Sequence, residues 1–256
     1  MGTAGAVATS TRDNVSLLVR IEHEQYLVDC SGSPVQRLLR AGGDYRASLA
    51  VIITHRHPDH LYGLPALLHS RMICSGELPP LNIYAPDETI AVISKLLNAF
   101  WQRERVVDYV SLIPIRPVEN HLLLETSDAQ ILTNPVEHGP ETVAVKFVER
   151  KTANSLVYSS DTSPCDGLVS FASGASDLIH DCTFCDQEEA SRATGHSTAK
   201  QAGFVARRAD VERLILTHFG SKAEDTVQCV REAASFFDKE IVAASDMQEF
   251  ICGAGL

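Results

Sequence analysis

Short apolar runs alternate with amphipathic helical patterns along all 256 residues of the chain. The runs are rich in β-branched residues and bounded by turn residues, which is typical of strands. Apolar positions three or four residues apart predict helices instead. The predicted strands are Val15–Arg20, Tyr26–Asp29, Ala50–Thr54, Leu81–Tyr84, Leu112–Pro117, His121–Glu125, Ala129–Pro135, Val143–Val148, Ser155–Ser159, Ser176–His180, Arg213–Thr217 and Glu240–Ala243. The predicted helices are Val35–Ala41, His60–Ser70, Thr89–Phe100, Ser197–Arg208 and Ala223–Phe236.

No proline- or serine-rich linker, repeat or block of like charge interrupts this alternation, so we predict one domain over residues 1–256. Many strands with interspersed helices favour a layered α/β fold, with sheets packed together and helices outside. The apolar content of 45% and charged content of 21% are those of a folded globular protein.

The charge balance disfavours general coating of nucleic acid. Lys and Arg number 22 against 33 Asp and Glu, a net charge of −11 that repels phosphate backbones. No apolar run approaches the ~20 residues that span a bilayer, and the N-terminal segment lacks a signal-peptide pattern. We therefore expect a cytoplasmic protein without membrane contact.

The seven cysteines are an odd number without the spacing of a disulfide framework, which predicts thiols kept reduced. Cys182 and Cys185 form a CxxC pair, but no second pair follows that would complete a structural zinc site. We interpret both as small buried residues near a strand end.

Candidate chemistry is concentrated in Leu49–Pro65, where a buried apolar strand ends in His55, His57, Asp59 and His60. The two-residue period of a strand end turns the first two histidines the same way. A proline-enforced turn then points the Asp-His pair toward a neighbouring position. Imidazole and carboxylate suit Zn²⁺, so the spacing predicts two adjacent metal sites.

Three later polar residues are placed in the same way, each directly after an apolar strand: His138, Asp161 and His218. One alone could be an ordinary turn residue. Three in series favour a single convergent site.

The segment Leu49–Pro65 resembles the signature of the metallo-β-lactamase superfamily, which implies an αβ/βα sandwich with metals at the sheet edge. Its Asp59-His60 pair resembles the dinuclear hydrolases. The diiron oxygen-reducing branch has Glu where this chain has His57, which argues against iron redox chemistry.

Further motifs resemble ribonuclease Z over the whole chain: Gly2–Asn14, Tyr26–Cys30 with Gln36–Gly42, Tyr158–Cys165, His180–Phe184 and Gly195–Ala202. Because Met1 directly precedes Gly2, the family's first strand is expected to be missing or shortened. The family has Glu where this chain has Asp181, which is one methylene shorter.

The resemblance implies two Zn²⁺ per chain, with Mn²⁺ and Fe²⁺ as alternatives, and a homodimer. One zinc would bind His55, His57 and His138, the other Asp59, His60 and His218, and Asp161 would bridge them. A metal-bridged hydroxide would then attack the substrate, with Asp59 available to accept the proton. The resemblance also implies that Asp181 and His196 assist catalysis without binding metal, His196 protonating the leaving oxygen. A competing interpretation makes His196 a neighbour of a helix N-cap.

Ribonuclease Z members that process tRNA carry a long basic arm, commonly between the ligands that match His138 and Asp161. Here those ligands are 23 positions apart (161 − 138), which leaves room for a hairpin only. The leading hypothesis is therefore a dinuclear zinc phosphodiesterase acting on small phosphodiesters or exposed RNA 3′ ends. The alternatives are a tRNA 3′-processing endonuclease proper, a hydrolase of carboxylic esters, lactones, thioesters or sulfate esters, and a catalytically weak binding protein.

Overall fold

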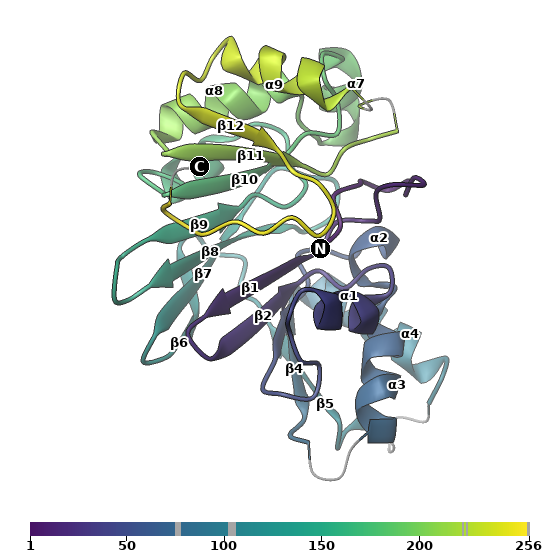
Figure 1. Cartoon of the computed structure of the whole chain (residues 1–256). Coiled ribbons are helices and arrows are strands. Elements are labelled where there is room, and N and C mark those ends of the chain that lie inside the picture. The colour runs from purple at the N-terminus through teal and green to yellow at the C-terminus, as the bar shows by residue number, and fades with distance from the viewer. Residues whose placement is uncertain (75–77, 102–105, 222, 224, 255–256) are drawn as a thin grey trace.

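Two β-sheets pack together, with helices on their outer sides (Figure 1). The computed structural model describes residues 1–254 apart from 75–77, 102–105, 222 and 224. The first sheet has the order β1-β2-β3-β4-β5 and the second β12-β11-β10-β9-β8-β7-β6. The strands are β1 Leu17–Ile21, β2 Glu24–Val28, β3 Ala50–Ile52, β4 Leu81–Ala85, β5 Val110–Pro114, β6 His121–Glu125, β7 Ala129–Pro135, β8 Val143–Glu149, β9 Ser155–Tyr158, β10 Asp177–Asp181, β11 Arg213–Thr217 and β12 Glu240–Ala243. The helices are α1 Pro34–Arg40, α2 Pro58–Leu61, α3 Leu64–Cys74, α4 Asp87–Asn98, α6 Asp166–Phe171, α7 Glu188–Thr194, α8 Ala199–Ala209 and α9 Thr226–Ala234.

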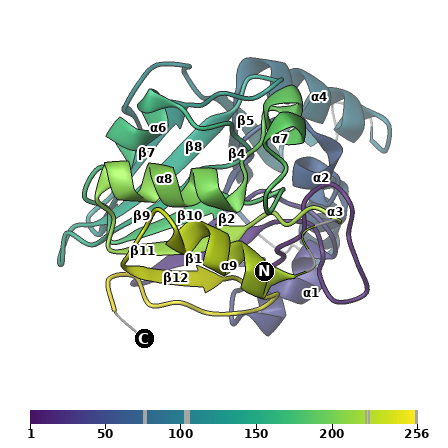
Figure 2. The same ribbon diagram turned by 90° about the horizontal axis from the view of Figure 1, so that it is seen from above.

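The layers follow from the alternation of side chains along the strands. On β10, Leu178 packs among the residues of α6, α8 and α9, while the next residue, Ile179, packs between the sheets. On β3, Val51 packs toward α1, α3 and α4, and Ile52 packs between the sheets. Both faces of each sheet are therefore buried there, and Figure 2 shows α8 and α9 beside the second sheet. The predicted αβ/βα sandwich is confirmed.

Strand direction brings the predicted metal-binding residues to one end of each sheet. Strands β2, β3, β4 and β5 pair in parallel, as do β9, β10, β11 and β12. Strand β7 runs in the same direction as β9, because each is antiparallel to β8 between them. The carboxyl ends of β7, β9, β10 and β11 consequently lie at one edge of the second sheet.

The sequence pattern located the strands well and the helix ends less well. The bounds predicted for β6, β7, β11 and β12 are confirmed, and the other strands shift by one to three residues at an end. The predicted helix His60–Ser70 is wrong as one element, because it divides into α2 and α3. Gly63 donates its N–H to Cys30 O at 2.8 Å, and a Cβ at Gly63 would lie only 2.7 Å from that oxygen. This docking of one backbone against another interrupts the helix.

Two short helices, α6 and α7, were not predicted. Helix α7 has no large apolar residue that could mark a helical period, and the six residues of α6 include a glycine at the second position. Position 224 of the predicted helix Ala223–Phe236 lies outside the described residues. The segment before β1 forms isolated bridges from Gly2 to Ser16 and from Ala4 to Asn14 and Phe219, without a continuous strand. In the parts of the chain that the structure describes, no helix is long and apolar enough to cross a membrane.

The expectation that all cysteines are thiols is wrong for two of them. Cys185 and Cys229 form a disulfide, with their Cα atoms 4.9 Å apart and a sequence separation of 44. Helix α9 carries Cys229 into the core cluster that also contains Cys185 and Cys182. The CxxC pair is buried as predicted, but Cys185 bonds to a distant partner. Sequence spacing could not reveal a partner that only tertiary packing brings close.

We predict that protein denatured without reductant exposes five titratable thiols, the seven cysteines less the two in the bridge. Cys229→Ser should lower the free energy of unfolding by about 2–4 kcal/mol, because the bridge restricts the unfolded chain. Thiol titration and urea unfolding under oxidising conditions measure both quantities. Seven reactive thiols would show that the bridge is absent in solution.

Candidate metal centre

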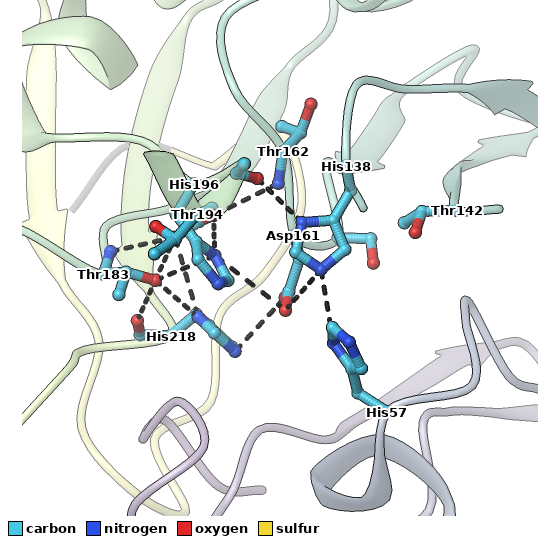
Figure 3. Close-up of polar contacts among 12 residues, drawn as sticks. His57, His138, Thr142, Asp161, Thr162, Thr183, Thr194, His196 and His218 are labelled. Atoms are coloured by element: carbon cyan, nitrogen blue, oxygen red, sulfur yellow. Dashed lines mark hydrogen bonds and ion pairs between the residues drawn. The ribbon is translucent and has the colours of Figure 1, made fainter. Parts of the chain in front are cut away.

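The imidazoles predicted to bind metal surround the carboxylate of Asp161 (Figure 3). Its Oδ2 atom lies 3.6 Å from His55 Nε2, 3.4 Å from His60 Nε2 and 3.9 Å from His138 Nε2. Its Oδ1 atom lies 3.2 Å from His218 Nε2. Histidines from four segments therefore meet at one carboxylate that follows β9. They come from α2 and from the segments that follow β3, β7 and β11.

A first group of donors consists of His55, His57, His138 and Asp161, which offer ligand atoms within 4.8 Å of one another. His57 Nδ1 lies 3.0 Å from His55 Nε2 and 3.3 Å from His138 Nε2. The three ring nitrogens thus converge on one point beside the carboxylate, which is the arrangement that a single cation requires.

A second group consists of Asp59, His60 and His218, whose ligand atoms also lie within 4.8 Å of one another. Asp59 Oδ2 is 3.6 Å from His60 Nε2 and 3.8 Å from His218 Nε2. Both histidines also face Asp161, so the two groups adjoin through that residue.

Unpartnered polar atoms show that these residues fit metal ions. His60 Nε2, His218 Nε2 and Asp161 Oδ1 are buried and have no hydrogen-bond partner among the described residues. Leaving such atoms unsatisfied is costly in a protein interior. Cations placed between them would satisfy all three, and imidazole nitrogen with carboxylate oxygen is a donor set that zinc accepts.

Local structure explains why the first motif points into this centre. Strand β3 ends where Thr54 N–H donates to Asp29 Oδ1 at 2.9 Å instead of continuing the sheet. His55 follows in a bend and His57 in extended backbone, and Pro58 then begins the single turn of α2. Asp59 and His60 are buried in that turn, so both are held toward the metal groups.

Three strand ends adopt left-handed backbone at residues other than glycine. Asp29 has φ 56°, Ser160 has φ 56° and His218 has φ 59°. Such conformations cost about 1–3 kcal/mol and persist where surrounding contacts enforce them. Here they turn the chain sharply at the site, immediately before Asp161 and at the predicted ligand His218 itself.

The electrostatics favour a charged carboxylate among imidazoles. Burial opposes the ionised form of Asp161, but the facing rings of His218, His60 and His55 hold its pKa well below the ordinary value. Burial and the neighbouring His60 push the pKa of His55 well below its usual range, so this ring is neutral. A neutral imidazole next to a carboxylate is ready to bind a cation.

Asp181 and His196 form a pair beside the metal groups. His196 Nδ1–H donates to Asp181 Oδ2 at 2.9 Å and lies 4.0 Å from Asp161 Oδ2. The aspartate therefore reaches the histidine despite lacking one methylene relative to the family's glutamate. Burial opposes the imidazolium, but the hydrogen bond and charge of Asp181 raise the pKa of His196 above its ordinary value.

Sequence reasoning missed three residues that support the predicted ligands. Asp29 accepts a hydrogen bond from His60 Nδ1–H at 2.7 Å, and Thr183 Oγ1 lies 2.8 Å from His218 Nδ1. The backbone carbonyl of Gly195 accepts a hydrogen bond from His138 Nδ1–H at 2.8 Å. Asp29 is the last residue of a predicted strand and directly follows β2, so a positional signal like that of Asp161 could have identified it.

A third group with ligand atoms within 4.8 Å of one another joins Asp181 and His196 to Asp161 and His218. Among the described residues, four histidines fall outside all three groups: His23, His69, His121 and His180. His69 stacks on Trp101, with ring centroids 6.0 Å apart. His180 is fully buried on β10, and its Nδ1 atom lies 2.9 Å from Asp181 O.

Comparison with known proteins places this geometry in a family. The profile of the beta-lactamase superfamily domain matches residues 24–219. The chain belongs to this superfamily. Within it, the chain resembles ribonuclease Z of Mycolicibacterium gilvum, with 31% identity covering 96% of this chain and 93% of the relative. Ribonuclease Z of Methanothermobacter thermautotrophicus is 28% identical over 95% of this chain and 92% of its own length.

Solved structures of the superfamily share the fold. The metallo-beta-lactamase fold protein YhfI from Bacillus subtilis superimposes with a TM-score of 0.80 at 23% identity, covering 96% of this chain and 94% of that protein. The short form of human tRNase Z gives a TM-score of 0.78 at 24% identity, with 96% and 95% covered. These superpositions support the sandwich architecture.

This superfamily member is shorter than its ribonuclease Z relatives. The match to the Methanothermobacter protein extends over 293 residues, so at least 37 of them have no counterpart here (293 − 256). Between His138 and Asp161, the chain forms only the antiparallel pair β8–β9. The prediction of a hairpin in place of an arm is confirmed.

We predict that Asp161→Ala binds far less zinc than the wild type and loses hydrolytic activity. Without this carboxylate, two neighbouring cations would repel each other at close range, and four facing imidazoles would lose their common anion. Elemental analysis after dialysis against zinc measures bound metal per chain. Wild-type zinc content in the variant would contradict the central position assigned to Asp161.

Proposed function

We propose that this protein is a dinuclear zinc phosphodiesterase that acts on small phosphodiesters or exposed RNA 3′ ends. The observation that carries the proposal is the hydrogen-bonded pair Asp181–His196, in which His196 Nδ1–H donates to Asp181 Oδ2. The pair lies beside Asp161, whose Oδ2 atom is 4.0 Å from His196 Nδ1. A metal cluster alone suits many hydrolytic reactions. An added proton donor suits substrates whose leaving oxygen needs protonation.

In this proposal, one ion binds the first donor group and the other binds the second, with Asp161 between them. When bound, such a pair of ions lowers the pKa of water and polarises the bond under attack. The residues that hold the ions are His55, His57 and His138 for one, Asp59, His60 and His218 for the other, and Asp161 for both.

Asp59 is the proposed acceptor of the proton from the attacking water. Burial opposes its charge, but His218 and His60 lower its pKa below the ordinary value, so it remains a carboxylate. Its side chain is 12% exposed, which leaves it the most accessible of the carboxylates at the centre. A charged, partly open carboxylate beside the metal groups can take up a proton at the start of the reaction.

His196 is the proposed donor to the leaving oxygen. Its Nδ1–H is engaged by Asp181, so the ring is oriented and Nε2–H is the proton available to substrate. The side chain is 16% exposed, whereas Asp181 is fully buried beneath it. The buried anion thus keeps a partly accessible imidazolium charged, as a general acid requires.

Substrate size is inferred from the short connection between β8 and β9 and from the net charge. The β8–β9 hairpin joins its strands through residues 150–154, without the extension that would grip a large RNA. The net charge of −11 adds no general attraction for a polyanion. Zinc as the native metal, two ions per chain, a cytoplasmic location and a homodimeric state are parts of the proposal that follow from the resemblance to ribonuclease Z.

We expect zinc-loaded protein to hydrolyse bis(p-nitrophenyl) phosphate with a kcat/KM at least comparable to that on precursor tRNA. Parallel assays on p-nitrophenyl acetate, a lactone, a thioester and a sulfate ester compare the competing bond types. Higher kcat/KM on one of those compounds would replace the phosphodiesterase assignment. Efficient, site-specific removal of a tRNA 3′ trailer would favour a tRNA-processing enzyme instead.

We expect His196→Ala to slow hydrolysis by about 10²–10⁴-fold for phosphodiesters with poor leaving groups. The loss should shrink for p-nitrophenolate, which departs with little protonation. Rates across a series of substituted phenyl esters, with zinc content measured in parallel, test this dependence. Equal slowing for all leaving groups, or loss of a zinc ion, would show that His196 is a ligand or a structural residue.

A further inference from the structure

The hydroxyl of Thr183 lies between the proton-donor pair and a metal-binding histidine (Figure 3). Thr183 Oγ1 is 2.7 Å from Asp181 Oδ1, 2.8 Å from His218 Nδ1 and 3.2 Å from His196 Nδ1. No other hydroxyl among the described residues has hydrogen-bond contacts with both of these histidines. The hydroxyl therefore links His196, the proposed proton donor, to His218, a proposed metal ligand.

The direction of each hydrogen bond follows from the chemistry of the partners. An ionised carboxylate can only accept, so Thr183 donates its hydroxyl proton to Asp181 Oδ1. The hydroxyl oxygen keeps two lone pairs, and one of them accepts from His218 Nδ1–H. This arrangement places the proton of the neutral ring on Nδ1. The free lone pair is then on Nε2, the buried atom that faces Asp161 and Asp59.

The carboxylate of Asp181 accepts four hydrogen bonds. Its Oδ1 atom accepts both the backbone N–H of Thr183, at 2.9 Å, and the hydroxyl. Its Oδ2 atom accepts from His196 Nδ1–H and, at 3.2 Å, from the backbone N–H of Thr162. One buried carboxylate thus orients His196 directly, and it contacts His218 both through the threonine hydroxyl and across 3.6 Å between Asp181 Oδ1 and His218 Nδ1.

We propose that Thr183 is a positioning residue that holds His218 in the Nδ1–H form and couples it to the carboxylate that orients His196. This inference rests on the proposed function, since it takes His218 as a metal ligand. Hydrogen bonds to the distal nitrogen of a metal-binding histidine fix its ring and strengthen binding. Thr183 would supply that support for the second donor group, as Asp29 does for His60 in the same group.

Zinc affinity in Thr183→Val tests the proposal, because valine keeps the shape of the side chain and removes the hydroxyl. Competition with a chromophoric chelator should show one of the two zinc ions bound about 10–100-fold more weakly. Thr183→Ser restores the hydroxyl and should return the affinity close to that of the wild type. If the valine variant does not fold by circular dichroism, Thr183→Ala is measured in its place.

Thr133→Val is the matched control, because Thr133 is a fully buried threonine on β7 whose hydroxyl has no partner among the described residues. It should bind both ions as the wild type does. At saturating zinc, Thr183→Val should also keep the wild-type dependence on leaving group, since His196 retains its direct bond to Asp181.

Three outcomes would overturn this inference and leave the proposed function intact. The first is wild-type zinc affinity in Thr183→Val, and the second is a loss of affinity that Thr183→Ser fails to restore. An equal loss in Thr133→Val would overturn it as well, by showing a general effect of buried threonine replacement. Failure of the wild-type protein to bind zinc would instead overturn the proposed function, and this inference with it.

Discussion

The charge of one buried carboxylate, that of Asp161, is the constraint on which the centre depends. An isolated ion at that depth would be expensive, and only opposite charge or polar partners on every side make it tolerable. Four imidazoles supply part of that compensation, yet Asp161 Oδ1 and two of the facing ring nitrogens stay without hydrogen bonds among the described residues. The protein's own groups therefore leave buried polar atoms at the centre without hydrogen bonds, and bound cations would interact with those atoms.

The fold brings these groups together because parallel strands end at a common edge. Asp161 follows β9, His218 follows β11, and Asp181 ends β10 between them. Ser160 and His218 turn the chain after β9 and β11 in left-handed backbone. Asp29 and Thr183 support predicted ligands, each in contact with the Nδ1 atom of a histidine whose Nε2 atom faces Asp161. A second set of residues thus holds the predicted ligands without belonging to the two donor groups.

The sequence predicted the strands, the sandwich and all the donors of the two groups, because each signal is local. An apolar run followed by His or Asp can be recognised without knowing the neighbouring strand. The rest depended on contacts between distant segments. Gly63 interrupts a helical pattern only because Cys30 lies against it, and Cys185 meets Cys229 only after α9 has packed. The position of Thr183 after a strand does not reveal its contacts, which are with Asp181 at the end of β10, His218 after β11 and His196 between α7 and α8.

Anomalous diffraction from crystals grown with zinc, recorded on both sides of the zinc absorption edge, tests the central claim most directly. Two peaks about 3.5–4 Å apart are expected, the spacing of cooperating ions in hydrolases. One should lie among the first donor group, the other among the second, and Asp161 should contact both. A single peak, or two peaks that Asp161 does not join, would contradict the account.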